Sequence, residues 1–322
     1  MSAFTSNHFE LQELAGGVYA AIATDGGAAV SNAGLVDLGG LLPKVPAGSP
    51  GPVLVFDSFL TPQAALDLRR AAEQLTGRAP GIVINSHYHN DHIWGNQAFL
   101  PEAQILSSAR TRQLITTAGK EELDWYRANS AAQLAAFQQR YRDAAGEEQR
   151  SQLKMWVGYY AGLVEAMPHL KVCLPGITFQ GWLEVHGETR SARLIEFEGA
   201  HTGSDAVLYL PQDGIVFAAD LLFVGCHPYL GDGDPQRLLE ALKKLRELEA
   251  EVFVPGHGPV GSRADLELLI EYAEGCMDTA RNLAAGGPVA EERFAALQPP
   301  EKFAAWKLSR FYPANIKFLC GL

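Results

Sequence analysis

The densest group of metal-ligating side chains lies at residues 87–92, which read HYHNDH. Neutral imidazole and carboxylate groups are ligands that suit Zn(II), and also Fe or Mn. His87 and His89 are two residues apart, so on an extended segment both rings point to one side and can reach one ion. Asp91 and His92 are adjacent, and only a turn of the chain would aim them at a second ion. Nine histidines in 322 residues do not produce such a cluster by chance.

Three further segments each offer one candidate ligand. His201 lies in GAHTGSD, Asp220 ends FAAD, and His257 lies in PGHG, where glycines allow a close backbone approach. A single histidine at the end of a strand is more often a hydrogen-bonded surface residue than a ligand. Together, however, the four segments supply five histidines and two aspartates, enough for two cations.

These residues all follow apolar segments with the composition of buried strands. Strands are predicted at 81–85, 194–197, 216–219 and 252–254, each leading into one of the four segments. Asp57 ends a similar run at 53–56, before a helix that begins at Thr61 as N-cap and Pro62 in the first turn. The carboxyl ends of strands are where α/β folds carry their sites.

The remaining chain is predicted to hold two strand-rich stretches on either side of a helical segment. Residues 18–38 indicate a hairpin and residues 39–52 a Gly/Pro-rich loop. The helical segment, broken near Gly146, is too aromatic for a solvated spacer and is expected to pack on the body as a pair of helices. We predict a single domain over residues 1–322, with a helical insert at about 107–167 and a C-terminal helical segment at about 262–322.

The order HxHxDH, His, Asp, His resembles the metallo-β-lactamase superfamily. The resemblance implies an α/β fold, an αββα four-layer sandwich with its site along one sheet edge. It also implies a dinuclear centre that most often holds two Zn²⁺ ions, with Fe or Mn as alternatives. The implied ligands are His87, His89 and His201 for the first ion, Asp91, His92 and His257 for the second, and Asp220 as the bridge. Asp57 stands where the family keeps an Asp that braces the HxHxDH loop, although a plain strand-end cap is an alternative.

Asp220 favours some branches of the family over others. Secreted lactamases of one subclass carry Cys at this position, and Cys226 lies six residues too late. The resemblance therefore implies a hydrolase that uses a zinc-bound hydroxide, oriented by Asp91 as the catalytic residue, to cleave a small ester, thioester, lactone or amide. A β-lactamase proper is one alternative, and an iron-dependent oxygenase similar to persulfide dioxygenases is another.

Two residues outside the motifs are weaker candidates for the site, and one acidic segment is not a candidate. His227 and Tyr229 follow Asp220 closely and are candidates for lining a substrate pocket, which the helical insert is expected to shape. The segment Asp232-Gly233-Asp234 lacks the rest of an EF-hand loop, and helix capping explains Asp234.

Composition restricts the partners. The net charge of −11, with no dense Lys/Arg run, disfavours nucleic acid, and no apolar window is long enough to span a membrane. Four scattered cysteines without CxxC spacing, and an N-terminus unlike a secretory signal, predict a cytoplasmic protein. The expected partner is a small-molecule substrate. The C-terminal segment is expected to pack on the body or on a second copy in a homodimer.

Overall fold

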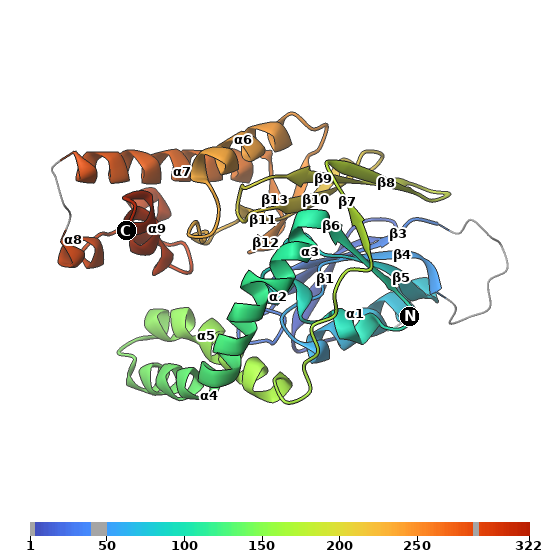
Figure 1. Cartoon of the computed structure of the whole chain (residues 1–322), viewed down its shortest axis with the longest axis horizontal. Coiled ribbons are helices and arrows are strands. Elements are labelled where there is room, and N and C mark those ends of the chain that lie inside the picture. The colour runs from blue at the N-terminus through green and yellow to red at the C-terminus, as the bar shows by residue number, and fades with distance from the viewer. Residues whose placement is uncertain (1–3, 40–49, 286–289) are drawn as a thin grey trace.

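The computed structural model describes residues 4–39, 50–285 and 290–322. Two β-sheets face each other at its centre, and helices cover their outer faces (Figure 1). This is the predicted αββα sandwich. Most of the predicted Gly/Pro-rich loop, at residues 40–49, lies outside the described residues.

Each sheet contains a parallel part that ends at the site. The first sheet has, in chain order, β1 (Phe9–Ala15), β2 (Val18–Ala23), β3 (Ala33–Asp37), β4 (Pro50–Phe56), β5 (Ala79–Ile84), β6 (Gln104–Ser108) and β7 (Ile177–Phe179). The second has the spatial order β13 (Gly261–Ser262), β12 (Val252–His257), β11 (Ile215–Phe223), β10 (Asp205–Leu210), β9 (Ser191–Phe197) and β8 (Trp182–His186). Strands β4 to β7 pair in parallel, as do β11 and β12, so within each sheet their carboxyl ends lie at one edge.

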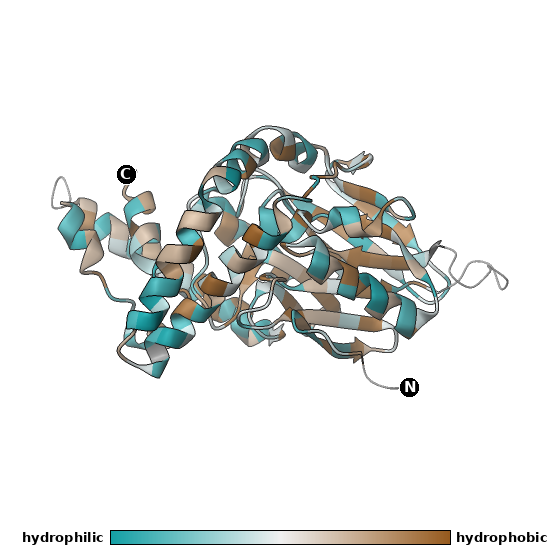
Figure 2. Ribbon diagram, turned by 90° about the horizontal axis from the view of Figure 1, so that it is seen from below, coloured by the Kyte–Doolittle hydropathy of each residue, from teal (hydrophilic) through white to brown (hydrophobic). Residues whose placement is uncertain are grey.

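The alternation of side chains along the strands builds separate cores on the two faces of each sheet. In β4, Leu54 and Phe56 point to the opposite sheet, where they share a core with Phe217 of β11. Val53 and Val55 point outward and pack with the first long helix. Figure 2 shows hydrophobic residues (brown) along the strands and hydrophilic residues (teal) on the outer helices. Strands with two buried faces are therefore nearly continuous apolar runs.

The outer layers and the insert are helical. Helix α1 (Pro62–Thr76) covers the first sheet and begins as predicted, with the Thr61 hydroxyl accepting from the amide of Ala64. The other helical elements are α2 (Asn90–Ile93), η1 (Asn96–Phe99), α3 (Ala109–Thr116), α4 (Ala118–Asp143), α5 (Glu147–Ala166), α6 (Pro235–Arg246), α7 (Arg263–Ala284), α8 (Glu291–Ala295), η2 (Glu301–Phe303) and α9 (Phe311–Leu319). No helix in the described part of the chain is both long and apolar enough to cross a bilayer.

The insert differs from the sequence-based prediction in two respects. It holds three helices rather than a pair, because the backbone at Thr117 (φ −113°, ψ −91°) leaves the helical region between α3 and α4. It also begins at Ala109, since Ser107 and Ser108 complete the short strand β6, which was not predicted. The aromatic side chains of the insert share a core with Ile93 and Trp94, so the insert packs directly on the HxHxDH segment.

The C-terminal segment packs on the body of this chain. Tyr272 of α7 and Tyr312 and Ile316 of α9 share a core with Leu222 of β11 and Phe253 of β12. In Figure 1 these helices lie on the same side of the sandwich as α4 and α5. A homodimer stays a prediction.

Candidate metal centre

The residues of the four predicted ligand segments converge at the carboxyl ends of strands from both sheets. Residues 87–92 follow β5, His201 follows β9, Asp220 lies within β11, and His257 ends β12. A short helical turn, α2, carries Asp91 and His92, which supplies the change of direction that an extended segment could not. Two non-glycine residues at this edge, Asp57 and Ala219, have left-handed backbones (φ 62° and 45°). Such strain is typical of sites where the fold forces a side chain into place.

Asp220 lies between two groups of potential ligands. Its Oδ2 is 3.3 Å from Nε2 of His201 and 3.9 Å from Nε2 of His87. Its Oδ1 is 3.1 Å from Nε2 of His92 and 3.5 Å from Nε2 of His257. The first group comprises His87, His89, His201 and Asp220, and the second Asp91, His92 and His257; within each, the ligand atoms lie within 4.8 Å of one another.

The unpaired polar atoms of this cluster fit a cation. Among the described residues, His87 Nε2, His92 Nε2 and Asp220 Oδ1 are buried at the cluster without a hydrogen-bond partner. Leaving so many buried polar atoms unpaired would cost several kcal/mol in total, at about 1–3 kcal/mol for each group. Imidazole nitrogens and carboxylate oxygens are donors for Zn²⁺ and similar ions, so the residues present fit metal binding.

The charges of the cluster depend on one another. Burial and the neighbouring His92 and His89 lower the pKa of His87 well below its usual value, so this ring is neutral. Burial alone would lower the pKa values of His92, His201 and His257, but the neighbouring carboxylates, Asp220 foremost, together outweigh it and raise all three. Burial would raise the pKa of Asp220, but His92 and His257 hold it well below the usual range. A cation entering the cluster would take the place of these protons.

Hydrogen bonds to the Nδ1 atoms of His92 and His87 orient these two rings. Asp57 Oδ2 lies 2.8 Å from His92 Nδ1, and its two oxygens also accept from the amide and the hydroxyl of Ser86, both at 2.8 Å. The Ser86 hydroxyl is 2.9 Å from His87 Nδ1. In both rings Nε2 is thereby left facing the cluster. Asp57 thus contacts the HxHxDH segment as a brace would, rather than capping the end of its own strand.

Asp232, to which the sequence assigned no role, orients a third ring. Its Oδ2 accepts from the Tyr88 hydroxyl at 2.5 Å and lies 3.1 Å from His89 Nε2. Burial would raise the pKa of Asp232, but the hydrogen bonds from His89 and Tyr88 lower it below the usual value, so the group is a carboxylate. The His89 Nδ1 atom then points to His201, at 3.2 Å from its Nε2. No local pattern signals this contact, because 143 residues separate Asp232 from His89.

Replacing Asp232 by Asn is expected to weaken metal binding about 10- to 100-fold, the usual effect of losing a carboxylate that orients a ligating histidine. Competition with a metal-binding dye would measure the affinity. The matched control is Asp234→Asn, two residues along the same loop, where Asn still caps α6. Equal affinities of the two variants would contradict this role for Asp232.

The neighbourhood of Asp220 explains two further features of the sequence. A Cβ at Gly256 would lie only 1.8 Å from Asp220 Oδ1, so glycine is required beside His257. Cys226 does not take the place of Asp220: its buried Sγ contacts the main-chain oxygen of Val224 at 3.5 Å. Burial raises the pKa of the Cys226 thiol to about 12, which keeps it protonated and a poor ligand.

A cavity of about 900 Å³ opens onto both ligand groups. Its floor includes His89, Asp91, His201, Asp220 and His257. Its walls come from the insert and from the beginning of α9, including Glu122, Tyr126, Trp156, Tyr159, Tyr160, Arg310 and Phe311. This volume is typical of small-molecule sites. The insert therefore forms a wall of the cavity, as expected.

Of the two candidate pocket residues, only Tyr229 lines the cavity, and its ring centroid is 6.4 Å from that of His89. His227 is fully buried among the C-terminal helices instead, with Nδ1 2.9 Å from the Tyr272 hydroxyl. Burial lowers the pKa of His227 to about 4, so it is a neutral residue of the core. Its nearness to Asp220 in sequence was misleading, because the His227 amide donates to the main-chain oxygen of Lys307 and its ring packs against Tyr272 and Trp306 instead.

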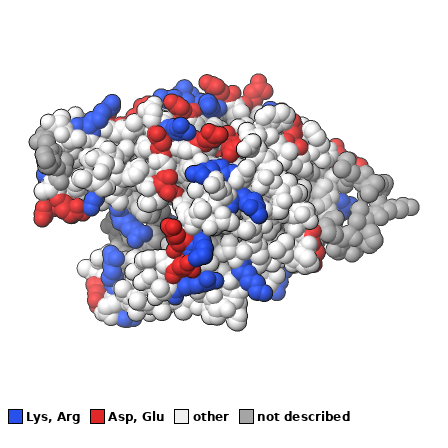
Figure 3. All heavy atoms as spheres, in the orientation of Figure 1, with Lys and Arg blue, Asp and Glu red and all other residues white. Residues whose placement is uncertain are grey.

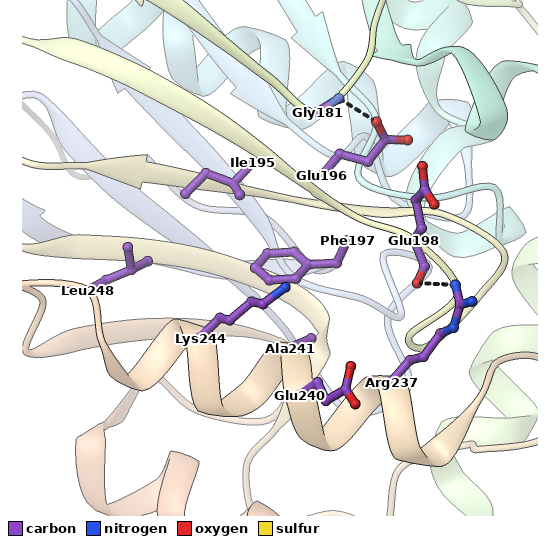
Figure 4. A pocket seen from close by; sticks show the side chains of 10 residues that line it. All are labelled: Gly181, Ile195, Glu196, Phe197, Glu198, Arg237, Glu240, Ala241, Lys244 and Leu248. Atoms are coloured by element: carbon purple, nitrogen blue, oxygen red, sulfur yellow. Dashed lines mark hydrogen bonds between the residues drawn. The ribbon is translucent and has the colours of Figure 1, made fainter.

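A second cavity, of about 560 Å³, lies between β9 and α6. Figure 4 shows Phe197 and Lys244 beside it, with Arg237 donating to the main-chain oxygen of Glu198. None of the ligand candidates lines it. The chemistry of the site is therefore confined to the larger cavity.

The chain resembles proteins of known activity over part of their length. It is 24% identical over 193 residues to a hydroxyacylglutathione hydrolase from Synechococcus sp., covering 57% of this chain and 52% of the relative. It is 25% identical over 236 residues to the 2,4-dinitroanisole O-demethylase subunit alpha of Nocardioides sp., covering 71% and 57%. The chain spans about half the length of these curated relatives.

Solved structures share the fold. The stereoselective inverting sec-alkylsulfatase Pisa1 from Pseudomonas sp. superimposes with a TM-score of 0.66 at 15% identity, covering 97% of this chain and 50% of that one. A metallo-beta-lactamase from Pontibacter korlensis gives 0.56 at 17% identity, covering 83% and 99%. The model of the metallo-beta-lactamase superfamily matches residues 30–257, which include every ligand candidate. The chain therefore belongs to the metallo-β-lactamase superfamily.

Proposed function

We propose that this protein is a hydrolase that uses two zinc ions to cleave a small ester, thioester, lactone or amide in the cytoplasm. The observation that carries the proposal is the pair of His/Asp groups beside the large cavity, in each of which the ligand atoms lie within 4.8 Å of one another. The distant relationship to a hydroxyacylglutathione hydrolase supports hydrolysis of an acyl bond. When bound, the ions would supply Lewis-acid activation of water and polarisation of the carbonyl group.

The residues of the site fall into proposed ligands and residues that orient the ligands. His87, His89 and His201 would hold one ion, Asp91, His92 and His257 the other, and Asp220 would contribute one oxygen to each group. Asp57, Ser86 and Asp232 fix the orientation of three of the rings. This leaves the ligand set preorganised for its ions.

Asp91 is the residue proposed to move the proton. It lines the cavity, and its Oδ2 lies 3.4 Å from His257 Nε2 and 3.8 Å from His92 Nε2. A carboxylate at this place can accept a hydrogen bond from the attacking water and later deliver the proton to the leaving group.

A panel of substrates tests the proposal. Protein loaded with Zn²⁺, Fe²⁺ or Mn²⁺, at measured stoichiometry, would be offered an ester, a thioester, a lactone, nitrocefin and a phosphodiester. We expect turnover of at least one acyl substrate with zinc and little of the phosphodiester. Nitrocefin as the best substrate would favour a β-lactamase, and oxygen uptake with one iron per chain would favour an oxygenase. Either result would overturn the proposal.

A further inference from the structure

Arg310 presents an unneutralised positive charge to the cavity. Its guanidinium carbon lies 3.4 Å from the centroid of the Trp156 ring and 5.1 Å from that of Phe311. Among the described residues it forms neither a hydrogen bond nor an ion pair. The neighbouring Lys307, by contrast, is paired with Asp25 at 2.6 Å. In a chain with a net charge of −11, a cavity cation without an acidic partner calls for an explanation.

The contact with Trp156 leaves Arg310 ready to bind an anion. A guanidinium that lies over an aromatic ring is attracted to the ring face and keeps the N–H groups at its rim available. These N–H groups form a fork that matches the two oxygens of a carboxylate. Because the ring already restrains the side chain, little conformational entropy would be lost on binding.

An aromatic wall leads from the metal centre to Arg310. The centroids of His89 and Tyr229 are 6.4 Å apart, and those of Tyr229 and Phe311 are 5.6 Å apart. Asp91 and Asp232 lie at the metal-centre end of this wall, away from Arg310. Lys154, also without an ion pair among the described residues, lines the cavity from α5, the helix that carries Trp156. In Figure 3, Lys and Arg side chains (blue) border the notch between the insert and the C-terminal helices.

We propose that Arg310 is a specificity residue that binds a carboxylate of the substrate. The substrate class is then an acyl compound whose reacting carbonyl lies at the metal centre and whose acidic group lies at Arg310. The aliphatic or aromatic part between them would pack on Tyr229 and Phe311. This inference rests on the proposed hydrolase function.

Two substrates that differ in one carboxylate test the proposal: p-nitrophenyl butyrate and mono-p-nitrophenyl glutarate. In Arg310→Gln we expect the KM for the glutarate ester to rise about 10- to 100-fold, the usual effect of losing a charge-assisted hydrogen bond, with kcat little changed. Arg310→Lys should restore part of the loss, and the kinetics with the butyrate should stay within about twofold of wild type. Equal losses with both esters would overturn the proposal.

The matched control is Arg140→Gln. Arg140 also lies over an aromatic ring, 5.1 Å from the centroid of Phe137, but does not line the cavity. Thermal melting would show that the variants are folded.

Calorimetric titration of the zinc-loaded protein with glutarate gives a readout that needs no turnover. We expect binding to weaken in Arg310→Gln but not in Arg140→Gln. Glutarate binding that is unaffected by Arg310→Gln would contradict the carboxylate site. Failure of the wild-type protein to cleave any acyl substrate would instead overturn the hydrolase function, and glutarate binding would still report on Arg310.

Discussion

Replacing His89 by alanine is expected to lower hydrolytic turnover by about three orders of magnitude or more while leaving the far-UV circular dichroism spectrum near that of wild type. His89 is one of four residues in the first ligand group, and its Nδ1 faces His201 at 3.2 Å. Its side chain is 16% exposed on the cavity floor, so its loss leaves no hole in the core. Steady-state kinetics and metal analysis of the same sample would measure the effect.

Metal content makes this experiment specific. The second group of Asp91, His92 and His257 remains intact in the variant. We therefore expect the variant to bind about one metal ion per chain, where the wild-type protein binds two. The matched control is His186→Ala, an exposed histidine of β8 whose ring contacts Ser191. Wild-type turnover in His89→Ala, or an equal loss in His186→Ala, would refute the assignment.

Removal of metal by a chelator should abolish turnover and lower the melting temperature, and added zinc should restore both. The reason is the set of buried, unpaired ligand atoms, which a cation satisfies only in the folded state. At a free zinc concentration of about 1,000 times Kd, binding to one site would add about 4 kcal/mol to the free energy of unfolding. Scanning calorimetry with and without zinc would measure the shift in Tm.

The same experiment has an expected dependence on pH. Asp220 and the other neighbouring carboxylates together outweigh burial and raise the pKa values of His92, His201 and His257 in the metal-free fold, so these rings retain protons that zinc must displace. Zinc binding should therefore release protons, and the affinity should fall as the pH is lowered from about 8 to 6. Activity that survives exhaustive chelation, or a Tm that zinc leaves unchanged at both pH values, would contradict a metal centre.

The strands that were missed show where local patterns are too weak. β6 (QILSS) is short, ends in two serines and is followed at once by a helix, so its two serines were counted with the insert. β1 precedes the first predicted strand, and six of its seven residues are not fully buried because it forms the sheet edge. Both strands are stabilised by pairing with neighbours rather than by their own composition.

The identity of the ligand candidates could be predicted from the sequence alone. His87, His89, His201 and His257 stand beside buried strands within short motifs, and ligand chemistry depends on residue type and local spacing. The alternation of apolar residues likewise predicted the buried strands, because a period of two residues can be recognised within a short segment. These features need no knowledge of distant contacts.

Only the tertiary structure decided what surrounds those ligands. It brought Asp232 to His89 across 143 residues, moved His227 into a helical core, and placed Trp156 of the insert against Arg310 of the C-terminal segment. The physical reason is that these contacts join segments from different layers of the fold. Their partners are chosen by the packing of whole helices on sheets, which no motif of a few residues records.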